Sequence, residues 1–150
     1  MFPESTSSTR KVLHLSDTEL ATLVKELGRR VEVRDYPYLE VRADQKDVGD
    51  IFILDVLGQT LPITFAVGVE PRGAVRDIQV MVYREPRGDE VREDRFRRQF
   101  RGKRLADPIA LGRDVDAISG ATISSRSATY ATRKALALDA ILRARPDGER

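Results

Sequence analysis

Three apolar runs, separated by short turns, fill residues 51–83, which read IFILDVLGQTLPITFAVGVEPRGAVRDIQVMVY. Such short connections join antiparallel neighbours, so the runs predict a β-meander. Pro62 has no N–H to donate to a neighbouring strand, and it therefore predicts an edge position or the beginning of a strand. The predicted strands are Ile51–Leu57, Thr60–Val69 and Val75–Tyr83.

A helix is predicted on each side of these strands. Before them, Ser16 and Glu19 form a capping box and Gly28 suits the position just after a helix end. After them, Ser125–Ala144 forms a long helix in which small residues predominate at the beginning. The apolar stripes are Leu20, Leu23, Val24 and Leu27 in the first helix and Ala128, Ala131, Ala135, Leu138 and Leu142 in the second, whereas Arg126, Arg133, Lys134, Asp139 and Arg143 are expected to point outward.

These elements predict an α+β fold, in which an N-terminal helix and a long C-terminal helix pack against an antiparallel sheet of about five strands. Alternating residues at Val31–Arg34 and Tyr38–Arg42 predict the other two strands. A short helix is expected at Asp94–Phe100, with its two phenylalanines buried. We expect one domain over residues 11–144, between flexible tails at 1–10 and 145–150.

The composition excludes several kinds of redox and metal site. The chain has no Cys, so it has no thiol redox centre, no thiolate-held iron–sulfur cluster and no Cys-type zinc site. His14 is the one histidine, which excludes a multi-His metal site. Any redox function therefore depends on a bound organic cofactor.

The segment Arg84–Arg104 concentrates charge. It holds nine basic and five acidic residues, a local net charge of +4 in a chain whose net charge is +2. The carboxylates alternate with the arginines, which favours a solvated, self-neutralising surface over a nucleic-acid arm. A basic module that binds nucleic acid or acidic partners is the alternative interpretation of this segment.

The most informative stretch is residues 116–125, DAISGATISS. It joins a glycine turn and several hydroxyl groups to the beginning of a long helix, where free N–H groups and the helix dipole favour an anion such as phosphate. Gly120 and Ala121 allow a ligand to approach the backbone closely. The alternative is structural, because Ser and Thr before a helix are common caps and Gly is a common turn residue.

The pattern DxxSGATxS at residues 116–124 resembles the flavinylation signature of FMN-binding domains. These domains occur in periplasmic subunits of Rnf-type and sodium-pumping NADH:quinone oxidoreductases and in the nitrous-oxide-reductase maturation flavoprotein. The resemblance implies that Ser124 is esterified to the phosphate of FMN by a magnesium-dependent flavin transferase that uses FAD. Ser124 stands where well-known members have Thr, and Ser125 offers a second candidate hydroxyl.

The resemblance extends over roughly residues 50–143 and includes the loop Glu85-Pro86-Arg87-Gly88, where the family commonly has Glu-Thr-Pro-Gly. It therefore implies cofactor contacts from Glu85 and Gly88. In the motif itself, it implies that Gly120, Ala121 and the N–H groups after Thr122 hold the phosphate. The hydroxyl groups of Ser119 and Thr122 are expected to hydrogen-bond it.

Asp116 is the exceptional member of the motif, since a carboxylate repels a phosphate. Either it binds the transferase's magnesium or orients the acceptor during modification, or it caps the turn. Aromatic rings can cover a flavin, so the tyrosines are candidate stacking partners, although each is also a typical half-buried structural residue. The tyrosines are Tyr36, Tyr38, Tyr83 and Tyr130.

The function that the resemblance implies is that of an electron carrier rather than an enzyme in its own right. Its expected partners are the flavin transferase and redox proteins or a membrane electron-transfer complex, with no nucleic acid. The expected location is periplasmic or extracytoplasmic, with membrane association through a segment absent from this chain. A non-covalent FMN-binding or flavin-sensing module is the alternative function.

Overall fold

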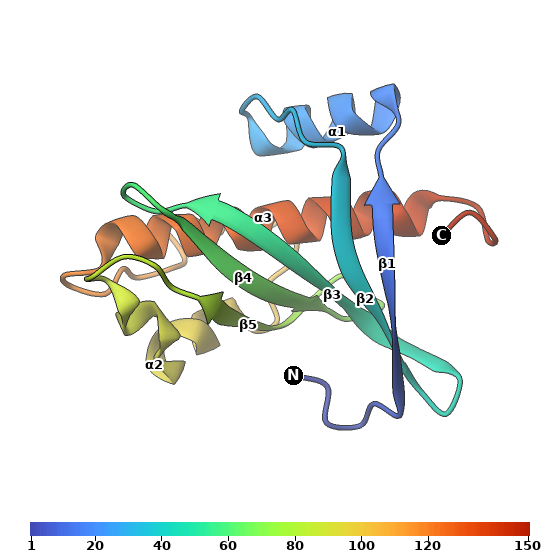
Figure 1. Cartoon of the computed structure of the whole chain (residues 1–150), viewed down its shortest axis with the longest axis horizontal. Coiled ribbons are helices and arrows are strands. Elements are labelled where there is room, and N and C mark those ends of the chain that lie inside the picture. The colour runs from blue at the N-terminus through green and yellow to red at the C-terminus, as the bar shows by residue number, and fades with distance from the viewer.

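Five antiparallel strands follow one another across one sheet in chain order in the computed structural model, which describes residues 1–150 (Figure 1). The predicted meander and its approximate strand number are thereby confirmed. Helix α1 joins the first two strands, and two 3-10 helices flank the short α2 after the last strand. The elements are β1 (Ser7–His14), α1 (Asp17–Leu27), β2 (Asp35–Ala43), β3 (Lys46–Leu57), β4 (Pro62–Val69), β5 (Val75–Val82), η1 (Asp89–Arg92), α2 (Asp94–Arg97), η2 (Arg98–Phe100) and α3 (Thr122–Ala144).

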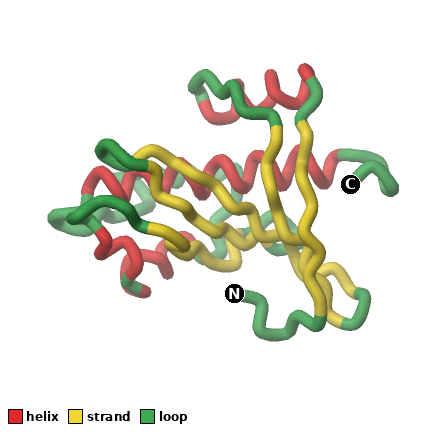
Figure 2. The backbone as a smooth tube through the Cα atoms, in the orientation of Figure 1, coloured by secondary structure: helices red, strands yellow, loops and turns green.

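Helix α3 lies along one face of the sheet and supplies the second layer of the fold (Figure 2). Its predicted stripe of small and apolar residues is buried against β3 and β4, as the sequence pattern predicts. Phe96 and Phe100 are also buried, and their rings meet edge to face with centroids 5.3 Å apart. None of the helices combines the length and apolar character that crossing a membrane requires.

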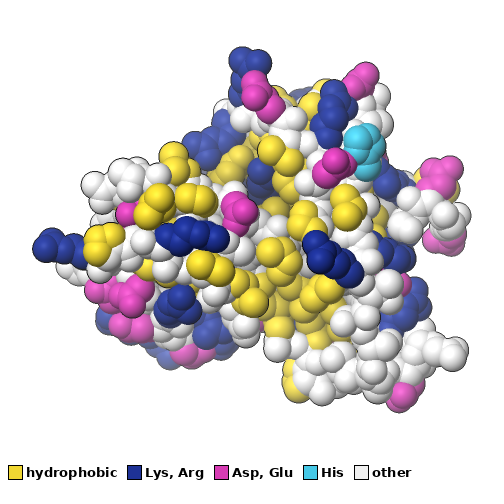
Figure 3. Space-filling view, viewed as in Figure 1, with side chains coloured by type: hydrophobic (Ala, Val, Ile, Leu, Met, Phe, Trp, Pro, Cys, Tyr) yellow, Lys and Arg dark blue, Asp and Glu magenta, His cyan; other side chains and the backbone are white.

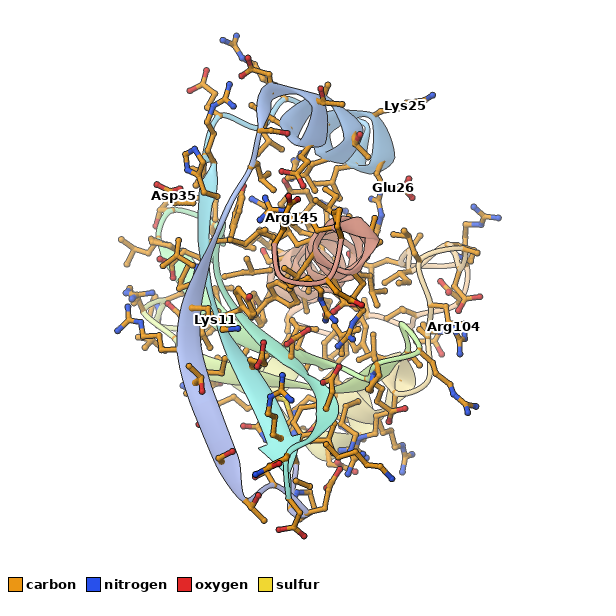
Figure 4. All side chains as sticks on the ribbon, turned by 90° about the vertical axis from the view of Figure 1, so that its right-hand side faces the viewer. Lys11, Lys25, Glu26, Asp35, Arg104 and Arg145 are labelled. Carbon is orange, nitrogen blue, oxygen red and sulfur yellow. The ribbon has the colours of Figure 1, made fainter.

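Helix α1 forms where its capping residues predict it. The Ser16 hydroxyl accepts the N–H of Glu19, the Glu19 carboxylate accepts the N–H of Ser16, and Gly28 ends the helix in the left-handed conformation with φ 67°. Arg145, just beyond α3, donates to the Glu19 carboxylate and to the His14 carbonyl, and Figure 4 shows it at the end of α3 below α1. This ion pair joins both helices to the end of β1.

Two parts of the predicted strand set are wrong. Residues 7–10, expected in a flexible tail, belong to β1, which pairs with β2 along its whole length. Only Leu13 of this edge strand is fully buried, so backbone pairing forms it without the apolar alternation that marks a strand in sequence. Conversely, Val31–Arg34 alternates but leads from α1 into β2 without belonging to a strand.

The face of the sheet that α3 does not cover is open to solvent in part, and Met1 and Phe2 pack against it at Gly68. Hydrophobic side chains are visible over the strands on this face in Figure 3. Val12 on β1 and Leu57 on β3 are 58% and 65% exposed, respectively. The main core therefore lies on one side of the sheet, between the strands and the two helices.

Asp139 does not point outward as its sequence position predicts. It is 2% exposed, and its carboxyl group shares the guanidinium of Arg143 with the buried Asp50 of β3. Arg143, one turn further along α3, donates to Asp139, Asp50 and Asp47 at 3.2, 2.9 and 2.9 Å. Burial raises the pKa of Asp139 to about 7 against the attraction of Arg143, and burial also raises the pKa of Asp50.

The raised pKa of Asp139 makes stability depend on pH. Between the ordinary aspartate pKa of about 4 and pH 7, the folded protein binds the proton that the unfolded chain has lost, so this contribution to stability falls as the pH rises toward 7. An asparagine side chain in its place stays neutral at every pH. We expect urea unfolding to show that Asp139→Asn gains about 2 kcal/mol over the wild type between pH 5 and pH 8. The exposed Asp147→Asn is the control, and parallel pH profiles for Asp139→Asn and wild type would contradict this account.

Candidate functional site

The motif 116–125 forms the turn that begins α3. Gly120 adopts φ 83°, a left-handed conformation that favours glycine, and Ala121 occupies the N-cap position. An alanine side chain cannot cap a helix, in contrast to Ser16 of α1. The N–H groups of Thr122, Ile123 and Ser124 consequently have no acceptor within the chain. Three donors and the positive end of a 23-residue helix dipole are thus available to an anion.

These donors lie beside a cavity of about 560 Å³, a size within the usual range of ligand pockets. Three segments far apart in the sequence form its walls: the β3–β4 turn, the loop that follows β5, and the beginning of α3. The lining residues are Gln59, Thr60, Tyr83, Glu85, Pro86, Arg87, Gly88, Gly120, Ala121, Thr122, Ile123 and Ser124.

Ser124 and Ser125, the two candidate acceptors, have different environments. Ser124 lines the cavity, and its Oγ lies 2.7 Å from the hydroxyl of Tyr83. Ser125 is fully buried behind the turn, where its Oγ donates to the Ala121 carbonyl at 2.7 Å and accepts the N–H of Ile118 at 3.3 Å. The hydroxyl of Ser125 therefore stabilises the turn, and only Ser124 of the pair adjoins the cavity.

Glu85 lines the cavity and holds the opposite wall in place. Its carboxylate accepts the N–H groups of Thr60 and Leu61 at 2.7 and 2.8 Å, which ties the loop after β5 to the β3–β4 turn. These backbone donors, Thr60 first, hold the pKa of Glu85 below its ordinary value. The carboxylate is thus already used to shape the cavity.

Gly88 is a close neighbour of Ser124. A Cβ on this glycine would lie 2.6 Å from Ser124 Oγ and 2.5 Å from the Tyr83 hydroxyl, distances that a real side chain does not tolerate. Its φ of 91° also favours glycine. Gly88 thus leaves room beside the Ser124 hydroxyl that any larger residue would fill.

Asp116 and Ser119 lie outside this cavity. Both are exposed and line a separate hollow of about 430 Å³ on the flank of the turn, together with Arg95, Arg98 and Gln99. The Gln99 side chain accepts the Asp116 N–H at 2.7 Å and donates to the Asp116 carbonyl at 3.0 Å. The Asp116 carboxylate itself bonds to no group of the chain, so the structure shows no capping role for it.

Of the four tyrosines, only Tyr83 lines the cavity. Tyr38 stacks on Phe52 in the core, Tyr36 donates to the Val33 carbonyl, and Tyr130 lies under the Arg29 guanidinium. The sequence suggests Tyr83 only as a ring, whereas the structure shows its hydroxyl at Ser124. Gln59 and Thr60 are further lining residues that no motif marks, because they come from a turn remote from 116–125.

The sequence profile of the FMN-binding domain family matches residues 58–137, more than half of the chain, and the chain belongs to this family. Among solved structures, the crystal structure of NqrC from Shewanella oneidensis is similar, with a TM-score of 0.64 and 18% sequence identity. The similarity covers 95% of this chain and 87% of that one, and it shows a shared fold. The search of curated proteins finds no match to the sequence.

Family membership implies that the chain binds FMN, and the cavity at the beginning of α3 fits such a group. Phosphate needs donors, which the uncapped amides of the helix supply. Close approach of a ligand to Ser124 needs the space that the missing side chain of Gly88 leaves. The matched range 58–137 contains all three walls of the cavity.

The role of Glu85 as a clamp predicts the behaviour of the opposite turn. Glu85→Gln exchanges a charged acceptor of two N–H groups for a neutral amide, and charge-assisted hydrogen bonds are roughly twice as strong as neutral ones. We expect the Thr60 and Leu61 amides to exchange hydrogen about tenfold faster at pH 7, as measured by NMR. The control is Glu93→Gln, which removes an exposed partner of Arg95. Unchanged exchange at both amides in Glu85→Gln would refute the clamp.

Proposed function

We propose that this domain is an electron carrier whose FMN is attached through a phosphoester to Ser124. The observation that supports the proposal most directly is the position of Ser124, which alone among the buried motif hydroxyls adjoins the cavity and the free amides of α3. Bound FMN supplies the one- and two-electron chemistry that the side chains of a cysteine-free chain lack. No residue of this chain has to act as acid, base or nucleophile during electron transfer.

The proposed attachment is a phosphoryl transfer to Ser124. Ser124 Oγ forms a bond to the phosphorus that carries the riboflavin half of FAD, while the pyrophosphate bond to that phosphorus breaks. AMP leaves with the electron pair of the broken bond, and the hydroxyl proton of Ser124 passes to a base of the magnesium-dependent flavin transferase. The step needs FAD as donor and no oxidant or reductant.

Different residues around Ser124 are proposed to contact the FMN phosphate and the transferase. The N–H groups of Thr122 and Ile123 are the proposed donors to the phosphate oxygens, and the exposed Thr122 hydroxyl adds a third. Arg87, on the loop opposite, places a cation at the same cavity. Asp116 and Ser119, on the flank, are proposed contacts of the transferase and its magnesium during modification.

The proposed partners are the flavin transferase and the redox proteins of an electron-transfer complex, and the proposed location is extracytoplasmic. The fold that the domain shares with NqrC is consistent with these proposed partners and this proposed location. The basic segment gives no support to nucleic-acid binding, since Arg95, Arg97 and Arg101 pair with carboxylates of the chain itself.

Mass spectrometry locates the attachment. After co-expression with a flavin transferase, the wild-type protein is expected to gain the mass of one esterified FMN, and Ser124→Ala is expected to gain none. Ser125→Ala is the matched control; it should fold less stably, because the Ile118 N–H and the Ala121 carbonyl lose a partner, but it should still carry the flavin. Full modification of Ser124→Ala would overturn the proposed site. Flavin that copurifies with wild type but is released by acid precipitation would show non-covalent binding instead.

The space at Gly88 gives a second prediction. Gly88→Ala places a methyl group against Ser124 Oγ, and we expect the initial rate of flavinylation to fall at least tenfold. Gly102→Ala is the control, since Gly102 has a similar φ of 83° but nothing within 4 Å of an added Cβ. Equal rates for the two variants would show that backbone strain, rather than crowding of the acceptor, explains any loss.

A further inference from the structure

The hydroxyl groups of α3 share a bonding pattern from which Ser124 departs. Ser125, Thr129 and Thr132 each donate to a carbonyl three or four residues earlier in the chain. Such back-bonding is the usual way in which Ser and Thr satisfy their hydroxyls within a helix. Ser124 makes no such bond, and its only hydrogen-bond partner is the Tyr83 hydroxyl, from a different element.

The direction of the Tyr83–Ser124 hydrogen bond follows from a count of protons. The Tyr83 hydroxyl also bonds to the Arg87 carbonyl, and a carbonyl can only accept. Tyr83 has one hydroxyl proton, which is donated to Arg87. Ser124 must therefore donate its own proton to the Tyr83 oxygen.

This arrangement suits an acceptor of a phosphoryl group. With its proton directed at Tyr83, Ser124 Oγ keeps its lone pairs for other partners, and Ser124 lines the cavity. The Ser125 hydroxyl is not free in this way, because it donates its proton to the Ala121 carbonyl and accepts the N–H of Ile118. Gly88 adds to the effect, since no Cβ crowds either Ser124 Oγ or the Tyr83 hydroxyl.

We propose that Tyr83 is a positioning residue for the modification of Ser124: it draws the acceptor hydroxyl away from the backbone of its own helix and holds the lone pairs of Oγ toward the incoming phosphorus. The inference rests on the proposed function and adds a residue outside the 116–125 motif to it. Tyr83 takes no part in the bond that breaks, and its positioning role acts through the Ser124 hydroxyl. Without the tyrosine hydroxyl, Ser124 is expected to donate to a carbonyl of the preceding turn, as Ser125 and Thr129 do.

Steady-state flavinylation of the full chain tests the proposal, with FAD, magnesium and purified transferase and with intact mass as the readout. Tyr83→Phe keeps the ring and removes only the hydroxyl. We expect kcat to fall about tenfold, while KM for the acceptor protein stays unchanged because the surface that the transferase meets is the same. Tyr130→Phe is the matched control; it lies on the same helix as Ser124 and has no hydroxyl contact to it. A general loss of structure would lower Tm and raise KM instead.

A second measurement uses the wild type and does not depend on any variant. NMR is expected to show a slowly exchanging Ser124 hydroxyl proton with nuclear Overhauser contacts to the Tyr83 ring. An unchanged kcat in Tyr83→Phe overturns the proposal, as does a Ser124 hydroxyl that exchanges too fast to be seen. If Tyr83→Phe loses its fold, the NMR result decides. Ser124→Ala distinguishes failure of the acceptor proposal from failure of the positioning proposal. If Ser124→Ala is unmodified and Tyr83→Phe reacts at the wild-type rate, only the positioning role of Tyr83 is refuted. If Ser124→Ala is modified, the role of Ser124 as acceptor is refuted.

Discussion

The contact between α3 and the sheet determines where every other part of the molecule lies. Ala128, Ala131 and Ala135 are buried at that contact, so the helix backbone approaches β3 and β4 closely. Ser127 reinforces the contact by donating to the carbonyl of Leu57, at the end of β3. The beginning of α3 is thus held beside the β3–β4 turn, and a cavity forms only because these ends coincide.

The charged segment after β5 protects an edge of the sheet. Arg97 donates to the Ile78 carbonyl at 2.6 Å and to Asp77 at 2.7 Å, and Arg92 donates to the Val80 carbonyl. These carbonyls belong to the last strand, whose unpaired edge would otherwise invite association with another chain. Edge protection and ion pairing within the fold therefore account for Arg92, Arg95, Arg97 and Arg101 of the segment 84–104.

The sequence predicts the elements whose residues alternate or carry caps, and it misses those that depend on distant partners. The capping box of Ser16 and the stripe of α3 are local signals, and both helices form where they predict them, with α3 beginning three residues earlier than expected. β1 is an edge strand that buries one residue, and no local pattern could reveal it. Asp139 was expected in solvent because its partner Asp50 is 89 residues away in the chain.

The candidate site divides in the same way. A contiguous motif predicts Gly120, Ala121, Thr122 and Ser124, which the structure brings to the cavity, while it separates Asp116 and Ser119 from them. Glu85 and Gly88 also reach the cavity, though Glu85 serves to hold a turn. The Tyr83 hydroxyl could not be assigned from sequence, since its contact with Ser124 spans 41 residues and depends on how β5 ends.

Ala121 at the N-cap of α3 leaves the first N–H groups of the helix without a side-chain acceptor. A serine at such a position typically contributes about 1 kcal/mol to the stability of a protein, and here that contribution is forgone at the longest helix of the fold. An anionic oxygen that settles on the three vacant amides restores it. A bound phosphate group therefore also caps the N-terminus of α3. We expect the protein that carries such a group to unfold at a higher temperature than the protein without it.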